Sequence, residues 1–89
     1  MKEPATRARA EILALEALAW LAGHPDAIAR FLTISGIEAS DLRQAVGDRE
    51  LQASVLDYLL ANESLLLDFC QSASLKPQAI HHARHQLGG

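Results

Sequence analysis

The chain has 89 residues, of which 49% are apolar and 21% charged, and its formal net charge is −3. This length allows one small domain, and this composition excludes wholesale disorder. No apolar run approaches the roughly 20 residues that span a bilayer, and we expect no secretory leader. The single cysteine cannot form an internal disulfide. We therefore predict a cytoplasmic protein.

The first half of the chain has the pattern of three helices, each followed by a glycine. The first covers about residues 4–22 and is apolar most of the way round, which favours a central position packed by several neighbours. The second, about 25–35, opens on a proline and ends at Gly36. A short third helix covers 40–46, with Ser40 as its expected N-cap.

The second half has the same kind of pattern. Asp48 is the expected cap of a fourth helix to about residue 61, and Asn62 of a fifth over 63–73. A proline begins the sixth helix, 77–87. Leucine and alanine dominate, and no segment alternates apolar with polar residues as a strand would. The fold class predicted is all-α, a compact six-helix bundle in one domain.

The two halves resemble each other when the chain is shifted by 38 residues. Apolar positions and helix breaks then coincide, as in Leu18 with Leu56, Trp20 with Tyr58, Phe31 with Phe69, and Gly36 with Ser74. We therefore predict two similar three-helix halves, about 10–47 and 48–87, packed through the first and fourth helices. A chance match between two amphipathic helical stretches is the alternative.

Several local runs carry a family resemblance. They are Ala17–Ala22, Arg30–Leu32, Gly36–Ile37 with Asp41–Arg43, Val55–Leu60, and Glu63 with Leu65–Phe69. Together they resemble a family of short bacterial proteins classed only as a domain of unknown function. The match departs at Ala39, where a proline is expected. The resemblance implies a small cytoplasmic protein with no assigned activity, a signalling role, and a single-domain response regulator as a possible partner.

Charge is unevenly distributed along the chain. Residues 10–75 hold ten acids against three arginines, whereas the two ends are basic. An acidic centre repels a phosphate backbone, so nucleic-acid binding is disfavoured. Residues 32–46 still have the form of a helix-turn-helix, with Asp41, Arg43 and Gln44 on the second helix. Nucleic-acid binding is therefore kept as an alternative function.

Two groups of residues could carry chemistry. His81, His82 and His85 share one helix, but they fall on the side away from its apolar stripe, so a solvated helix end is favoured over a metal site. Cys70 lies near a helix C-terminus, without the base or helix N-terminus that activates a thiol. We predict a half-buried cysteine, no metal, no cofactor and no enzymatic activity. A small enzyme without a recognisable site is the alternative.

The remaining prediction is a protein–protein interaction module, with self-association as a homo-oligomer among the expected modes of binding. An apolar excess in so short a chain motivates it, because a small domain gains stability from a partner. The expected partner-binding residues surround the second turn, at Arg30, Phe31, Asp41 and Arg43. Trp20 and Tyr58 are expected in the core, with hot-spot anchors on the surface as the alternative.

Overall fold

The computed structural model describes residues 2–88, with side chains from residue 7 onward, and contains helices but no strand within that range. The helices are α1 (Lys2–Ala22), α2 (Pro25–Ser35), α3 (Ala39–Ala45), α4 (Arg49–Ala61), α5 (Glu63–Ala73) and α6 (Pro77–Gln86). The Cα radius of gyration is 12.3 Å, close to the about 12 Å expected for a compact chain of this length. The predicted all-α bundle is confirmed.

Helix ends follow the glycine and proline pattern, with local differences at the caps. Gly36 ends α2 in the left-handed region at φ 78°, and Ser74 ends α5 there at φ 58°. The predicted Ser40 cap is wrong, because α3 begins at Ala39 after Glu38. Asp48 and Asn62 occupy the N-cap positions of α4 and α5, but neither side chain caps the helix that it precedes.

The Asn62 side chain is used by the preceding helix. Its Nδ2 donates to the carbonyl of Tyr58, 2.7 Å away, near the end of α4. The backbone N–H of Asn62 bonds the carbonyl of Leu59. Asn62 therefore satisfies carbonyl groups at a helix C-terminus, where such groups lack partners within the helix.

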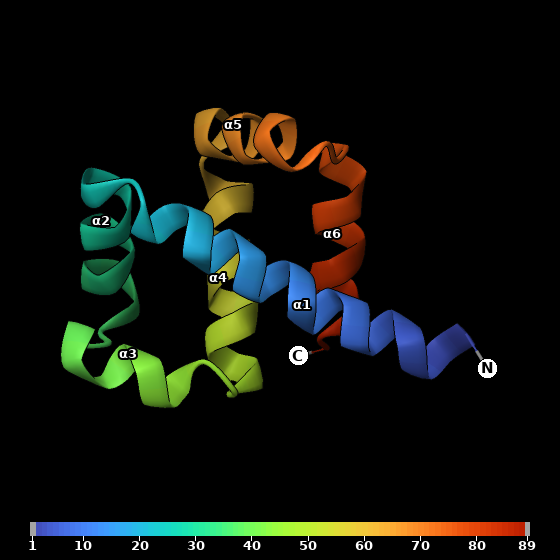
Figure 1. Ribbon diagram of the computed structural model, residues 1–89, viewed down its shortest axis with the longest axis horizontal. Helices are drawn as coiled ribbons and strands as arrows, with labels where there is room; N and C mark the ends of the chain where they lie inside the picture. Colours follow the sequence, from blue (N-terminus) through green and yellow to red (C-terminus); the bar gives the residue numbers. More distant parts are fainter. Residues whose placement is uncertain (1, 89) are drawn as a thin grey trace.

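Three helices meet around the core. In Figure 1, α1 crosses in front of α4 and α6, and contacts between α1, α4 and α6 join all three. α2 packs on α1 and α4, and α5 packs on α4 and α6. The predicted contact between the first and fourth helices is confirmed, but α1 packs against α6 as well.

Small residues on α1 let its neighbours approach. The small residues that face the interior are Ala10, Ala14 and Ala17, and Leu21 lies on the same side. Each of these residues is at most 3% exposed. Larger side chains from the other two helices fill the space above them, namely Leu51, Val55, Leu56 and Leu59 of α4 and Ile80 of α6 with Leu87 just beyond it. Close packing of this kind is what makes the interior sensitive to side-chain volume.

One ion pair ties α6 to α4 on the surface of this core. Arg84 Nε donates to Asp57 Oδ1 at 2.7 Å, and Arg84 Nη1 donates to the carbonyl of Gly88. Arg84 therefore holds the end of the described chain against the helix from which it emerges.

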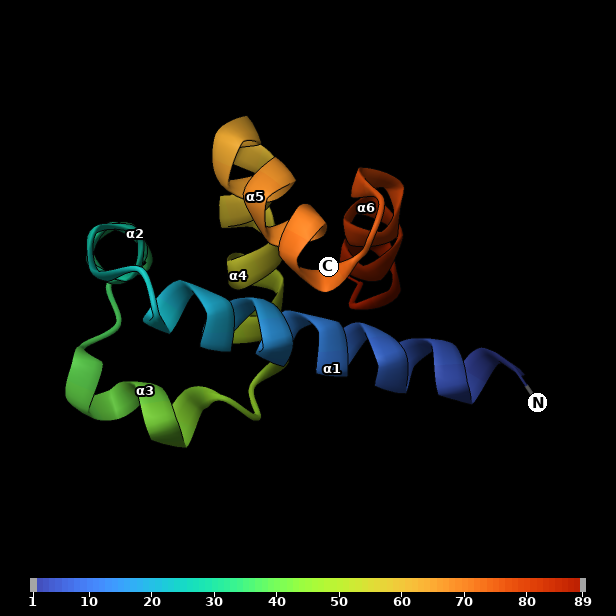
Figure 2. The same cartoon turned by 45° about the horizontal axis from the view of Figure 1, so that its top comes forward.

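α3 is the least packed helix. It contains no buried residue, and only half-buried side chains such as Leu42 reach the core cluster. In Figure 2 it lies at the lower left, spanning from α2 toward the start of α4. Two of the four predicted partner-binding residues, Asp41 and Arg43, are exposed on this helix.

The predicted duplication stays a prediction. α2 and α5 are both 11 residues long and begin 38 residues apart, at Pro25 and Glu63, and the left-handed residues Gly36 and Ser74 have the same spacing. The third helices differ, since α6 packs on both α1 and α4 whereas α3 has no buried residue.

Candidate interaction surface

The side of α1 opposite the core is apolar and exposed. We call it the outer face of α1, and it consists of Ala8, Ile12, Leu15, Ala19 and Ala22. Ile12 is 56% exposed and Leu15 is 38% exposed, which are high values for large apolar side chains. The steps of four, three, four and three residues place all five on one side of a helix.

α1 has the several neighbours that its apolar pattern predicts, but they leave the outer face exposed. α1 is apolar most of the way round, but its neighbours α2, α4 and α6 cover only the side that carries Ala14 and Leu21. Apolar character all round favours full burial in a larger protein. Within residues 2–88, the helices that pack on α1 leave this face exposed.

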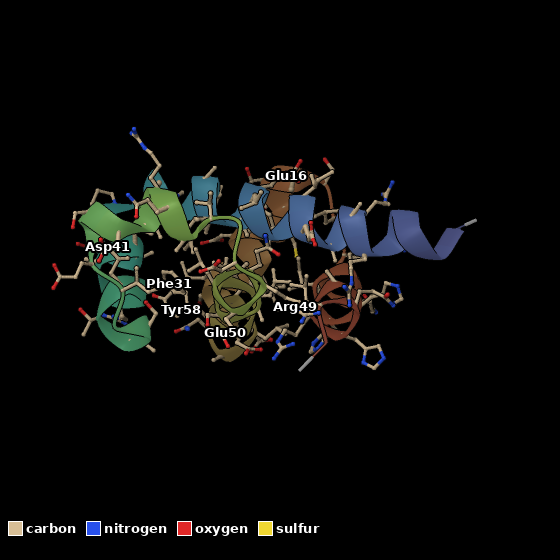
Figure 3. All side chains as sticks on the ribbon, turned by 90° about the horizontal axis from the view of Figure 1, so that it is seen from below. Glu16, Phe31, Asp41, Arg49, Glu50 and Tyr58 are labelled. Carbon is tan, nitrogen blue, oxygen red and sulfur yellow. The ribbon has the colours of Figure 1, made fainter. Side chains whose placement is uncertain are left out.

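Charged residues border the outer face on both edges. Arg9 and Glu16, seven residues apart, lie along one edge, and Glu11 lies along the other. Arg9 and Glu16 are exposed, and Figure 3 shows Glu16 directed away from the body of the molecule. An apolar strip with charged edges is the usual form of a helix–helix interface.

A groove of about 500 Å³ continues the outer face toward α6. Its lining combines apolar and charged side chains from α1 and from the α5–α6 region, namely Arg9, Ile12, Leu13, Glu16, Leu75, Ala79 and His82. Since Ile12 belongs to both the groove and the outer face, the two form one continuous surface.

The four predicted partner-binding residues do not form one surface. Phe31 is 1% exposed, so the expectation that it lies on the surface is wrong. Its ring centroid is 5.5 Å from that of Tyr58, between α2 and α4, as Figure 3 shows. Arg30, Asp41 and Arg43 are exposed on α2 and α3. Their roles in binding stay predictions, as does the nucleic-acid alternative for the α2–α3 segment.

Arg30 lies instead at a second groove, where α2 meets the junction of α4 and α5. This groove of about 530 Å³ also takes Asp26, Asn62 and Glu63 into its lining. Tyr58 lines it too, but the Tyr58 hydroxyl already donates to the carbonyl of Ala27 at 3.2 Å. The groove therefore has a mixed-charge rim over an aromatic ring that is fixed in place.

Trp20 and Tyr58 differ in burial. Tyr58 is 6% exposed and belongs to the core, as expected. Trp20 is half-buried and packs against it, with its ring 5.6 Å from Phe69 and 4.2 Å from His24 between centroids. The His24 ring also bonds the carbonyl of Trp20 through Nδ1 at 2.8 Å. His24 thereby covers one side of the indole at the end of α1.

Cys70 lies beneath these surfaces, whereas His82 of the histidine group lines the first groove. His81, His82 and His85 are exposed, as expected for a solvated helix side. Among the side chains of residues 7–88, no three histidine, cysteine, aspartate or glutamate residues gather as metal ligands. Cys70 is 3% exposed, more buried than predicted, and burial raises the pKa of its thiol. No helix within residues 2–88 has the length and apolar character to cross a membrane.

Sequence reasoning missed the outer face, although a signal for it was present. The run Ala8, Ile12, Leu15, Ala19 and Ala22 has heptad spacing, a pattern distinct from the core positions Ala10, Ala14, Ala17 and Leu21 on the same helix. One of these two apolar stripes packs on the core, and the other is exposed.

Comparison with known proteins gave one family match. A family model described as "Protein of unknown function (DUF3572)" matches residues 7–89. No curated protein and no solved structure matched in the corresponding comparisons.

Proposed function

The chain belongs to the DUF3572 family of unknown function, and from that premise we propose that it is a non-enzymatic protein–protein interaction module. The outer face of α1 is its binding surface. The observation that carries the proposal is the exposure of Ile12 and Leu15, at 56% and 38%, on the side of α1 that the other helices within residues 2–88 leave uncovered.

Physical chemistry supports this role for the outer face. Covering exposed apolar surface is favourable by about 25 cal/mol per Å², and contiguous apolar patches rimmed by polar groups mark interaction sites. A helix face also presents its side chains on a rigid element, so little conformational entropy is lost on binding. Ile12, the more exposed of the two large residues on this face, is the expected anchor.

The proposal includes the cytoplasmic location and the signalling role that the family resemblance implies. A single-domain response regulator is one partner it allows. Such a partner would bind by laying an apolar helix or groove against Ile12 and Leu15, as amphipathic helices do.

The test is affinity capture on immobilised protein, attached through its C-terminus so that α1 stays free. Wild-type chain and the Ile12→Glu variant are incubated with native extract, and retained proteins are identified by mass spectrometry. The proposal expects at least one protein, or a second copy of the chain, to bind wild type and to be lost with Ile12→Glu. A buried glutamate would face an apolar partner without compensation.

The matched control is Ile34→Glu. Ile34 is 67% exposed on α2, outside the outer face of α1, so the same change of side chain there leaves binding intact. Circular dichroism confirms that both variants are folded. If wild type and Ile12→Glu retain the same proteins, the outer face is not the binding surface and the proposal is wrong.

A further inference from the structure

We propose that the outer face of α1 pairs with the outer face of α1 in a second copy of the chain, with the two helices antiparallel about a two-fold axis. This inference rests on the proposed function and names its partner. The evidence is the arrangement of apolar and charged side chains along α1. When two copies of this helix are placed antiparallel, the apolar residues of one copy match those of the other, and opposite charges meet.

Apolar side chains match in size across such a pair. With the axis between Ile12 and Leu15, Ile12 lies opposite Leu15 of the second copy, and Ala8 lies opposite Ala19 of the second copy. The two large residues thus meet at the centre, while small residues meet toward the ends. The heptad spacing of the strip, already described, is the spacing at which two helices pack knobs into holes.

Charged side chains determine the direction of the pair. In the antiparallel arrangement, Arg9 of each copy lies beside Glu16 of the other, which gives two opposite-charge contacts. In a parallel arrangement, Glu16 would instead lie beside Glu11 of the second copy, which gives two like-charge contacts. Charges at the edges of an apolar seam set the orientation of paired helices in this way.

Two-fold symmetry also explains why one helix can serve as both sides of the interface. A two-fold interface uses the same patch on each copy, so every contact occurs twice. In Figure 1, α1 crosses in front of α4 with no other helix drawn over it. Ile12 and Leu15 are exposed, so this face is accessible to a second copy. Glu16 points outward on that same side in Figure 3.

The decisive experiment reverses single charges and then mixes the variants. Arg9→Glu alone places two glutamates opposite each other, and Glu16→Arg alone places two arginines opposite each other. Each variant is expected to dissociate at least about tenfold more readily than wild type, because two attractive contacts become repulsive. An equimolar mixture of the two restores opposite charges on both sides and is expected to restore association. Sedimentation equilibrium measures all four samples.

Two apolar variants complete the design. Ile12→Glu is expected to abolish dimer formation, whereas Ile34→Glu, on an exposed position of α2, leaves it unchanged. All four substitutions change residues at exposed positions, and circular dichroism of each variant separates loss of pairing from loss of folding.

Each outcome decides between the two proposals. The antiparallel pair is supported if the wild type forms dimers, each charge variant alone associates more weakly, and the mixture of the two variants associates as the wild type does. A wild-type chain that stays monomeric, or a mixture that fails to restore association, overturns it. If the chain is monomeric but captures another protein through Ile12, the interaction function stands and only the second copy is excluded. If it is monomeric and captures nothing through Ile12, both fail.

Discussion

Tyr58 connects two helices through both parts of its side chain. Its ring lies 5.5 Å from that of Phe31, and its hydroxyl donates to the carbonyl of Ala27 at 3.2 Å. Both contacts bind α4 to α2, and both side chains are nearly inaccessible to water. The aromatic pair therefore holds α2 in place and gives Phe31 a structural role.

Replacing Tyr58 by phenylalanine tests the hydroxyl alone. Tyr58→Phe is expected to lower the free energy of unfolding by about 1 kcal/mol, since it removes one hydrogen bond and keeps the ring. Phe31→Ala is expected to cost about 3–5 kcal/mol, because it leaves a cavity beside that ring. Urea unfolding followed by circular dichroism measures both. An equal loss for the two variants would contradict this account of Tyr58.

Cys70 links stability to pH. Burial raises the pKa of its thiol above the ordinary value of 9.0, so the folded chain keeps the proton longer than the unfolded chain does. Stability is therefore full below pH 9 and falls as the pH rises past it. Comparing wild type with Cys70→Ala, we expect their difference in free energy of unfolding to shift against wild type as the pH rises past 9. A difference that is independent of pH would contradict the prediction.

At the scale of the element, the left-handed ends of α2 and α5 differ in residue type. Gly36 and Ser74 both take positive φ, at 78° and 58°, after helices of equal length. Glycine adopts this region freely, whereas serine has a Cβ that crowds the following carbonyl. α5 therefore ends in a conformation that its own residue disfavours.

Ser74→Gly is expected to raise the free energy of unfolding by about 0.5–1 kcal/mol, because it removes the steric cost of the left-handed conformation. Gly36→Ser, the reverse change at the corresponding turn, is expected to lower it by a similar amount. Thermal and urea unfolding of both variants provide the measurement. Loss of stability in Ser74→Gly would mean that the serine side chain contributes more than its backbone conformation costs.

Helix positions could be predicted because their signals are local. Gly36 and Pro25 act on the backbone beside them, and α2 begins and ends where they indicate. Which side of a helix faces the core depends on residues far along the chain. Phe31 was expected on the surface near the second turn, but α4 lies against α2 and buries it. The apolar pattern of α1 likewise did not show that Ile12 is 56% exposed, because that depends on where the other helices pack.

For the whole molecule, the buried alanines of α1 set how closely the helices pack. Ala14 is fully buried where α1 meets its neighbours. We expect Ala14→Leu to lower the free energy of unfolding by about 1–3 kcal/mol or more, because the added volume forces α1 away from the core. Ala29→Leu, on an exposed position of α2, is the control and is expected to change stability by less than about 0.5 kcal/mol. Differential scanning calorimetry compares the two, and equal effects would contradict this picture.

The loose packing of α3 has a consequence for how the chain could be divided. Since α3 contributes no buried residue, the backbone can be cut there while the contacts of α1 with α4 and α6 stay intact. One fragment would end with α2 and the other begin with α4, and neither could bury its apolar side without the other. Two such fragments should reassemble when mixed, which makes α3 the natural position for a split reporter built from this fold.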